Sequence, residues 1–270
     1  MFSLESLFSL RGRTALVTGG STGLGRICAE ALLVAGARVL IASRKHDNCV
    51  AVAQELSALG PCEGFAGDVH SEDGVRVFAE AVRQRTDTLD ILINNAGATW
   101  GADFETFPWS GWDRVLSVNV TGLFTLTREL MPMLLAAGSP QSPARVVNIG
   151  SVTGTLPITE RAYSYAASKA AVHHLTRMLS HEFAARHVNI NAIAPGPFAT
   201  RMTAFALNSE EGRAHASAAV PMRRLGQPSD LAGTVLFLCG PGSAYTTGAI
   251  IPVDGGMSAD VPQQLWPDPV

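Results

Sequence analysis

The chain has 270 residues, of which 47% are hydrophobic and 16% are charged, and its formal net charge is −3. This composition supports a sizeable core, and without a basic run or patch we expect no binding to nucleic acid or to an anionic membrane. The four cysteines form no zinc-type pair with one another or with histidine, so we expect free thiols and no metal site.

The first residues, MFSLESLFSLRG, include an acidic residue and lack the basic start of a signal peptide. No uninterrupted apolar stretch reaches the roughly 18 residues that a membrane helix needs. We therefore expect a cytoplasmic protein without a membrane segment.

Apolar strands alternate with amphipathic helices along the chain. The predicted strands are 14–18, 38–43, 63–69, 89–95, 144–151, 188–195 and 248–255. The predicted helices are 23–36, 47–59, 71–86, 111–137, 162–186 and 228–240. Continuous apolar strands separated by helices are typical of a parallel sheet whose two faces are both covered. The pattern predicts an α/β fold, a Rossmann-type doubly wound parallel sheet of about seven strands.

No linker and no repeat of solenoid length interrupts this rhythm, so we expect a single domain over residues 1–270. The segment 196–222 consists of small helix-prone pieces rich in Ala, Phe and Met, and it follows the end of a strand. Long excursions at this place are candidate substrate lids. The C-terminal tail, 257–270, is rich in Pro, and two readings stay open: disorder, or contact with a neighbouring subunit.

The stretch TGGSTGLG (18–25) joins the first predicted strand to the first predicted helix. Backbone N–H groups and the helix dipole at such a junction favour a nucleotide pyrophosphate. Gly19 permits the tight turn, Gly23 lets the backbone approach a phosphate, and Gly25 lets the helix pack close to the sheet. The spacing is G-x-x-x-G-x-G rather than G-x-G-x-x-G, which leaves a merely flexible helix start as the alternative.

The same stretch contains G-x-S-x-G around Ser21, the motif that holds a nucleophilic serine in α/β-hydrolases. Such an enzyme needs an acid and then a histidine further along the chain. The later histidines fall mostly on helical stretches, and none stands out at the C-terminal end of a late strand. We therefore interpret Ser21 as a phosphate-side hydroxyl rather than a nucleophile.

Tyr165 and Lys169 lie four residues apart on a predicted helix and share a face. A lysine ammonium near a phenol stabilises the phenolate, so the tyrosine can exchange a proton near neutral pH. A surface pair is the alternative, but Lys45 and Lys169 are the only lysines in the chain. Ser151 ends a predicted strand and is a further candidate. Asn119 lies in an apolar helix pattern, where an amide satisfied in the core is favoured over a functional one.

Taken together, these motifs resemble the short-chain dehydrogenases/reductases over almost the whole chain. TGGSTGLG matches that family's cofactor loop, NNAG (94–97) its central strand motif, and Y-x-x-x-K (165–169) its catalytic pair. Asn119 and Ser151 fall at the two other catalytic positions of the family. Because the motifs occur in the right order, the resemblance makes Asn119 a catalytic candidate.

The resemblance implies hydride transfer between a nicotinamide cofactor and a carbonyl or carbinol carbon. Tyr165 would protonate the ketone oxygen or deprotonate the alcohol, and Lys169 would lower the pKa of Tyr165 and hold the nicotinamide ribose. Ser151 would orient the substrate oxygen, and Asn119 would hold a water of a proton relay. The predicted cofactor contacts are Gly19, Ser21, Thr22, Gly23, Leu24, Gly25, Ser43, Arg44, Asp68, Val69, Asn95, Ala96, Gly97, Tyr165, Lys169, Pro195, Gly196, Phe198 and Thr200.

The end of the second predicted strand, RVLIASRK, indicates which nicotinamide cofactor binds. An NAD site usually carries Asp or Glu here, about 20 residues after the glycines, to bind the ribose 2′-OH. This chain has Ser43 and Arg44 instead, and an arginine suits a 2′-phosphate. Asp47 is interpreted as the cap of the next helix. We therefore predict NADP(H) rather than NAD(H).

Three apolar loops, 97–110, 152–163 and 196–222, bound the predicted pocket. They either pack the lid onto the body or bind a hydrophobic ketone or 3-oxoacyl substrate. The sequence is similar to NADPH-dependent 3-oxoacyl reductases of the rhamnolipid-pathway type. It lacks the basic cluster that fatty-acid-synthesis reductases use to dock an acyl carrier protein, although Arg186 occupies another docking position. A free, CoA-linked or carrier-linked substrate therefore stays open.

The long predicted helices 111–137 and 162–186 match those through which the family forms homotetramers, and we expect a homotetramer. The favoured function is reduction of a ketone to a secondary alcohol with NADPH. An alternative is a dehydrogenase that oxidises an alcohol, polyol or steroid. A non-catalytic regulator that senses NADP(H) is a remote alternative, because all four catalytic positions are present.

Overall fold

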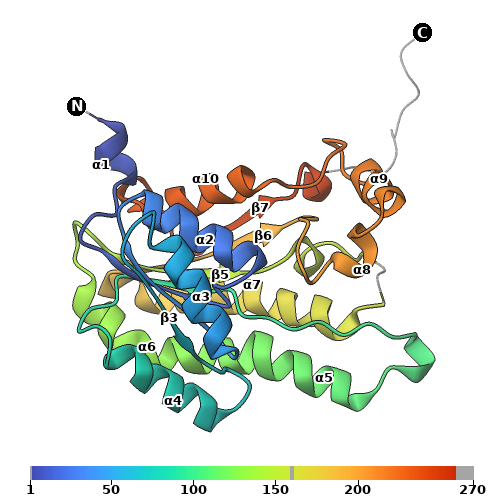
Figure 1. Cartoon of the computed structure of the whole chain (residues 1–270), viewed down its shortest axis with the longest axis horizontal. Helices are drawn as coiled ribbons and strands as arrows, with labels where there is room; N and C mark the ends of the chain where they lie inside the picture. The colour runs from blue at the N-terminus through green and yellow to red at the C-terminus, as the bar shows by residue number, and fades with distance from the viewer. Residues whose placement is uncertain (1, 159–160, 260–270) are drawn as a thin grey trace.

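The computed structural model describes residues 2–158 and 161–259. Its strands are β1 (Thr14–Thr18), β2 (Arg38–Ser43), β3 (Cys62–Ala66), β4 (Ile91–Asn94), β5 (Ala144–Ile149), β6 (Val188–Pro195) and β7 (Ile250–Val253). All pair in parallel in one sheet, in the order β3-β2-β1-β4-β5-β6-β7 (Figure 1). The prediction of a doubly wound parallel sheet of about seven strands is confirmed.

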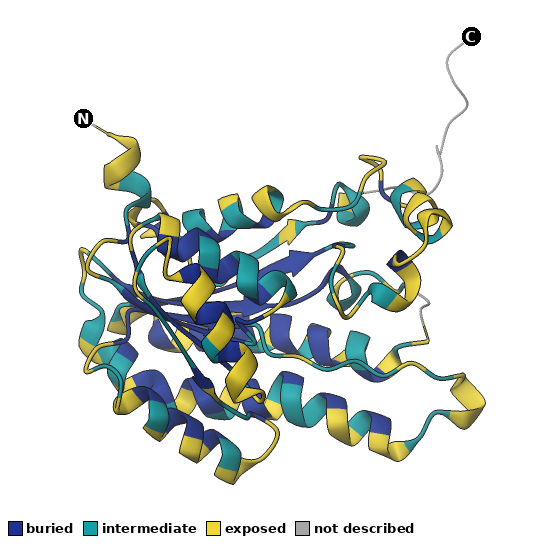
Figure 2. Cartoon of the chain, viewed as in Figure 1, coloured by how far each residue is buried: buried dark blue, intermediate teal, exposed yellow. Residues whose placement is uncertain are grey.

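Helices cover both faces of the sheet (Figure 1). They are α1 (Leu4–Phe8), α2 (Gly23–Val34), α3 (His46–Leu56), α4 (Glu72–Arg83), α5 (Trp109–Leu116), α6 (Leu123–Ala137), α7 (Tyr163–Phe183), α8 (Ala204–Leu207), α9 (Glu210–Ala218) and α10 (Pro228–Cys239). Helices α2, α3 and α10 share one apolar core with the sheet, and α4, α6 and α7 share another. The strands between these two cores are mostly buried (Figure 2). No helix in the described part of the chain is long and apolar enough to cross a membrane.

Helix α4 shows how local sequence sets an element. The Ser71 hydroxyl accepts the Gly74 N–H at the N-terminus, two acidic residues follow in the first turn, and Arg83 lies in the last turn. Each of these charges is opposite in sign to the helix dipole at the end where it lies, so each stabilises the helix. The apolar residues of α4 recur at helical spacing and are buried against the sheet; they are Val75, Phe78, Ala79 and Val82.

The predicted helix over 111–137 differs in the structure. A π-helical turn, Ser117–Gly122, separates α5 from α6. At Gly122 a Cβ would lie 2.0 Å from the Val69 carbonyl oxygen, so the turn lies directly against the segment that follows β3. Hydrophobic periodicity does not reveal such a turn, because the apolar residues on either side keep a helical spacing.

A buried polar ladder ties the middle of the sheet to two helices. The Asn94 amide of β4 donates to Thr127 Oγ1 on α6 and to Asn148 Oδ1 on β5, both at 2.9 Å. The Asn148 amide in turn donates to Thr176 Oγ1 on α7, also at 2.9 Å. All four side chains are buried. Because each of these amide nitrogens and hydroxyls has a hydrogen-bond partner, the ladder stabilises this register instead of weakening the core.

His173 on α7 is a second buried polar group, and it is less well satisfied. Its Nδ1 lies 3.4 Å from Thr155 Oγ1, and within the described ranges its Nε2 has no hydrogen-bond partner. Burial, together with the positive charges of Lys169 and Arg177, lowers the pKa of the imidazole to about 4. His173 is therefore neutral in the folded chain at neutral pH.

Replacing Asn148 with Ala should lower the free energy of unfolding by about 2–3 kcal/mol, because it leaves one Asn94 donor unpaired in the core and opens a small cavity. Urea unfolding at pH 7 measures this change. The exposed Asn208→Ala is the control and should stay within about 0.5 kcal/mol. A loss below about 1 kcal/mol for Asn148→Ala would show that the ladder does not stabilise the fold.

Acid should destabilise the protein in part through His173. Its pKa is lower in the folded chain than the ordinary 6.5, so between pH 6.5 and 4 the unfolded chain binds a proton that the folded chain does not. Stability that is complete above pH 6.5 therefore falls as the pH drops through this window. In urea unfolding, the free energy of unfolding falls between pH 7 and pH 5, and His173→Gln should make this fall smaller by on the order of 1–2 kcal/mol.

The adjacent, exposed His174→Gln is the matched control, and it should leave the loss unchanged. An equal pH 7 to pH 5 loss in the wild type and in His173→Gln would contradict the assignment.

Candidate active site

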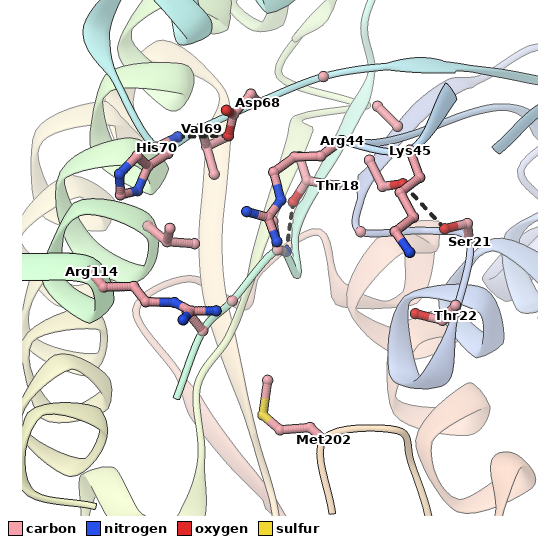
Figure 3. A pocket seen from close by; sticks show the side chains of 18 of the residues that line it. Thr18, Ser21, Thr22, Arg44, Lys45, Asp68, Val69, His70, Arg114 and Met202 are labelled. Carbon is pink, nitrogen blue, oxygen red and sulfur yellow. Dashed lines mark hydrogen bonds between the residues drawn. The ribbon is translucent and has the colours of Figure 1, made fainter. Parts of the chain in front are cut away.

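A cavity of about 830 Å³ opens at the carboxyl edge of the sheet. Its walls come from the segments that follow β1, β2, β3 and β4, together with residues of α5 and of the segment after β6 (Figure 3). The chain reverses its winding direction here, since β1 lies between β2 and β4. In open parallel sheets the crevice at such a switch point is where ligands bind.

The glycine-rich turn between β1 and α2 forms one wall. Gly19 and Gly23 have φ values of 65° and 55°, a left-handed region that favours glycine. At Gly25 a Cβ would lie 2.3 Å from the Gly19 carbonyl oxygen, so only glycine allows α2 to start this close to the strand. Thr22, the residue before α2, makes no side-chain cap, which leaves the first N–H groups of the helix available to an anion.

The side chain of Asn95 braces this turn. Its amide donates to the Thr18 carbonyl at 2.9 Å and to the Gly19 carbonyl at 3.2 Å. The Thr18 hydroxyl accepts the backbone N–H groups of Asn95 and Ala96, both at 2.9 Å. The end of β4 is thus locked to the glycine turn. Both hydrogens of the Asn95 amide are used inside the protein.

The end of β2 carries positive charge. Arg44 and Lys45 both line the cavity, and neither has an ion-pair partner in the described part of the chain (Figure 3). Ser43 lies beside them and its hydroxyl accepts from Ser21 Oγ at 3.3 Å. The prediction that Asp47 caps α3 is wrong: the helix starts at His46, and Asp47 lies inside its first turn. The carboxylate therefore supplements the helix dipole without capping the helix.

Nine of the 19 predicted cofactor contacts line this cavity, and Tyr165 and Lys169 are not among them. The predicted residues in its walls are Gly19, Ser21, Thr22, Ser43, Arg44, Asp68, Val69, Ala96 and Gly97. Lys45 and Asn48, which line the same wall, were not predicted. Lys45 had a signal in the sequence, as one of only two lysines and the neighbour of Arg44.

The predicted contacts after β6 are arranged differently. Gly196 and Phe198 line a second, smaller cavity of about 310 Å³, and the Phe198 ring is buried over Gly226. The ring of Phe198 is therefore part of the core, which leaves its backbone for any ligand contact. Thr200 lies close to the glycine turn, because a Cβ on Gly23 would be 3.4 Å from Thr200 Cβ.

Lys169 is buried between α7 and the end of β5. Its Nζ donates to the Ile149 carbonyl at 2.6 Å, and the same Nζ lies 5.5 Å from the centre of the Tyr165 ring. Burial lowers the pKa of the Lys169 ammonium to about 8. At neutral pH the lysine therefore still places a positive charge beside the phenol.

Asn119 connects the cavity to the same helix. Its Oδ1 accepts the Ala98 N–H at 2.7 Å, and its amide donates to the Ala98 carbonyl and to Ser168 Oγ, both at 2.9 Å. Ser168 is the residue before Lys169 on α7. Both amide hydrogens of Asn119 are thus used inside the protein. The π-helical turn places this side chain between the segment after β4 and α7.

Ser151 follows β5 and begins a short 3₁₀ turn, Val152–Gly154. Its side chain is nearly buried and accepts two hydrogen bonds from Thr153. Ser151, Tyr165, Lys169 and Asn119 thus come from the segment after β5, the first two turns of α7 and the π-helical turn, at the carboxyl edge of the sheet. Such a grouping of a phenol, an ammonium and a hydroxyl is suited to exchanging a proton with a substrate oxygen.

Known proteins are similar to this chain over nearly its whole length. A family model described as enoyl-(acyl carrier protein) reductase matches residues 19–258. The rhamnolipids biosynthesis 3-oxoacyl-[acyl-carrier-protein] reductase of Pseudomonas aeruginosa is 47% identical over 253 residues, covering 94% of this chain and 99% of the relative. A galactitol 2-dehydrogenase of Cereibacter sphaeroides is 37% identical over 253 residues, covering 93% and 97%.

A solved structure gives the same result. The Pseudomonas aeruginosa RhlG/NADP active-site complex superposes with a TM-score of 0.92 at 47% identity, covering 94% of this chain and 99% of that chain. The resemblance predicted from the motifs is confirmed by sequence and by structure. The chain belongs to the short-chain dehydrogenase/reductase family of oxidoreductases.

Proposed function

We propose that this enzyme uses NADPH to reduce a ketone, a 3-oxoacyl compound or another hydrophobic carbonyl, to a secondary alcohol. The observation that carries the proposal is the buried Lys169 ammonium beside Tyr165, held at the end of β5. Strand β5 pairs with β4, and the residues that follow β4 line the cavity suited to a nucleotide. The relative that is 47% identical is named as a 3-oxoacyl reductase, which supports the substrate class.

The residues present fit an NADP cofactor. The glycine turn leaves the backbone N–H groups at the start of α2 open to a pyrophosphate, and no side chain at Gly19 or Gly23 fills that space. Arg44 and Lys45 supply two cations at the end of β2 that form no ion pair with the residues the structure describes, at a place where a carboxylate would repel a 2′-phosphate. A solved relative is named as an NADP complex, in agreement with this donor set.

When bound, the cofactor would supply a hydride to the carbonyl carbon. The Tyr165 phenol would deliver the proton that the carbonyl oxygen takes up, and the Lys169 charge would stabilise the phenolate left behind. The Ser151 hydroxyl would donate a hydrogen bond to the same oxygen and fix its position. Asn119 would hold the segment after β4 against α7, and a water held by its backbone or Oδ1 would carry protons towards Lys169.

Apolar side chains support a hydrophobic substrate. In the segment 196–222, Met202 lines the cavity and Phe205 is 89% exposed on α8. An exposed phenylalanine three residues after a methionine that lines the cavity is suited to covering an apolar ligand. We therefore propose that this segment acts as the substrate lid.

Oxidation of an alcohol is the second candidate function. It is favoured by the polyol dehydrogenase that is 37% identical over nearly the whole chain. A panel of 3-oxoacyl thioesters, ketones and polyols, followed at 340 nm with each cofactor in both directions, separates the two. A kcat/KM for a polyol with NAD⁺ above that for every carbonyl with NADPH would overturn the proposal.

The substrate of such a reductase can be free, linked to CoA or linked to an acyl carrier protein. The loop after α6 has no basic residue between Gly138 and Ala144, so the basic cluster that would dock an acyl carrier protein is missing, although Arg186 is exposed. We therefore propose that a free or CoA-linked substrate is used. Titration with acyl carrier protein at low salt tests this, since saturable binding would contradict it.

We also propose that the enzyme assembles as a homotetramer in the cytoplasm through α6 and α7. Phe124 on α6 and Met178 on α7 are 39% and 55% exposed, an apolar exposure that packing between subunits would cover. Light scattering in line with gel filtration gives the mass, and a monomer at micromolar concentration would contradict this assembly.

Replacing Tyr165 with Phe should lower kcat by about 10²- to 10⁴-fold, because it removes the group that exchanges the proton. Steady-state kinetics with the best ketone of the panel and NADPH measure this. Tyr163→Phe is the matched control, since Tyr163 lies on the same helix and is 40% exposed; it should stay near the wild-type rate. A Tyr165→Phe enzyme that retains wild-type kcat would rule out the mechanism.

Replacing both Arg44 and Lys45 with Ala should weaken NADPH binding by about 10- to 100-fold and leave NADH binding nearly unchanged, because only NADPH carries the 2′-phosphate. Fluorescence titration of the reduced cofactor measures both dissociation constants without turnover. The exposed Arg76→Ala on α4 is the control. Equal weakening for both cofactors would contradict the assignment of the 2′-phosphate to this wall.

A further inference from the structure

The hydroxyl of Ser151 has a close neighbour that the known roles of the site do not use. Thr153 Oγ1 donates to Ser151 Oγ at 2.9 Å, and the Thr153 backbone N–H donates to the same oxygen at 3.2 Å. A serine hydroxyl has two lone pairs and one hydrogen. Both acceptor positions of Ser151 are therefore occupied by one residue.

With both acceptor positions filled, the Ser151 hydroxyl can interact with a substrate only by donating its hydrogen. A hydroxyl whose acceptor positions are filled cannot accept a hydrogen bond from the substrate, and it must donate. A carbonyl oxygen can only accept, so the polarity of Ser151 matches a ketone. We propose that Thr153 is a positioning residue that holds Ser151 as the hydrogen-bond donor to the substrate oxygen. This inference rests on the proposed function.

The turn that carries Thr153 is held in place by α7. At Gly154 a Cβ would lie 2.7 Å from the Lys169 carbonyl carbon, and at Gly150 a Cβ would lie 2.3 Å from His173 Nε2. The Gly154 N–H also donates to the Ser151 carbonyl at 3.0 Å. The turn therefore has little room to shift, and the distance between the two hydroxyls is set by the packing of two glycines on α7.

Of the two hydrogen bonds from Thr153 to Ser151, a substitution can remove only the one from the Thr153 hydroxyl. Valine has the shape of threonine and lacks its hydroxyl, while serine keeps the hydroxyl and loses the methyl group. In Thr153→Val the backbone N–H still donates to Ser151, but one lone pair is freed and the hydroxyl can rotate to other orientations. The expected effect is a fall in the fraction of Ser151 that donates to the substrate.

The test is a double-mutant cycle of Thr153→Val and Ser151→Ala, with Thr153→Ser as the conservative variant. Thr153→Val should lower kcat for ketone reduction by about 5- to 20-fold, the effect of losing one hydrogen bond of about 1–2 kcal/mol. Thr153→Ser should stay within about 3-fold of the wild type. In the Ser151→Ala background, Thr153→Val should change kcat by less than about 2-fold, because no serine remains to position.

Two further measurements separate positioning from a structural defect. The dissociation constant of NADPH by fluorescence and the thermal midpoint should be nearly the same in the wild type, Thr153→Val and Thr153→Ser. If the secondary alcohol is the better substrate, the same cycle is run in the oxidative direction, since Ser151 contacts the same oxygen there.

The outcomes are distinct. An unchanged kcat in Thr153→Val, or an equal fall in the Ser151→Ala background, would overturn the inference while Ser151→Ala alone still impaired turnover. If neither Ser151→Ala nor Tyr165→Phe impaired turnover, the proposed function itself would fail.

Discussion

A buried ammonium ties the site together. Lys169 Nζ donates to the Ile149 carbonyl, so helix α7 is joined to the end of β5 at the point where Ser151 leaves the sheet. A charge that is buried without such a bond would cost several kcal/mol, so the surroundings must keep this contact for the fold to be stable. The positions of Tyr165, one turn earlier on α7, and of Ser151 both follow from it.

A second set of contacts joins the cofactor side to this centre. The Thr18 hydroxyl and the Asn95 amide lock the end of β4 to the glycine turn, and the segment that follows β4 is held by Asn119. Asn119 in turn reaches Ser168, which precedes Lys169. A change at the glycine turn is therefore coupled by hydrogen bonds and packing to the end of α7 that carries the phenol. Fixed distances of this kind are what transfer between two bound molecules requires.

Much of this could be predicted from the sequence. The strands and most helices followed from apolar runs and their periods, and the carboxyl-edge site followed from glycines, Tyr165 and Lys169 in order. Other features gave little or no signal. The five-residue helix α1, with its Ser3–Ser6 capping box, is too short to show a period. The π-helical turn at Asn119 is hidden because the flanking residues keep a helical spacing. The start of α3 at His46 also differs from the prediction that Asp47 caps this helix, because an acidic residue suits the first turn as well as the cap.

The sequence by itself determined the fold class, the family and the kinds of side chain at the site, because these depend on local period, glycine positions and motif order. Only the tertiary structure decided which partner each polar group has. The Phe198 ring lies in the core, the Asn119 amide is fully engaged, and the acceptor positions of Ser151 are filled by Thr153. These facts depend on contacts between segments far apart in the chain, or on the exact turn geometry. Neither spacing nor composition specifies where a hydroxyl or an amide finds its hydrogen-bond partner.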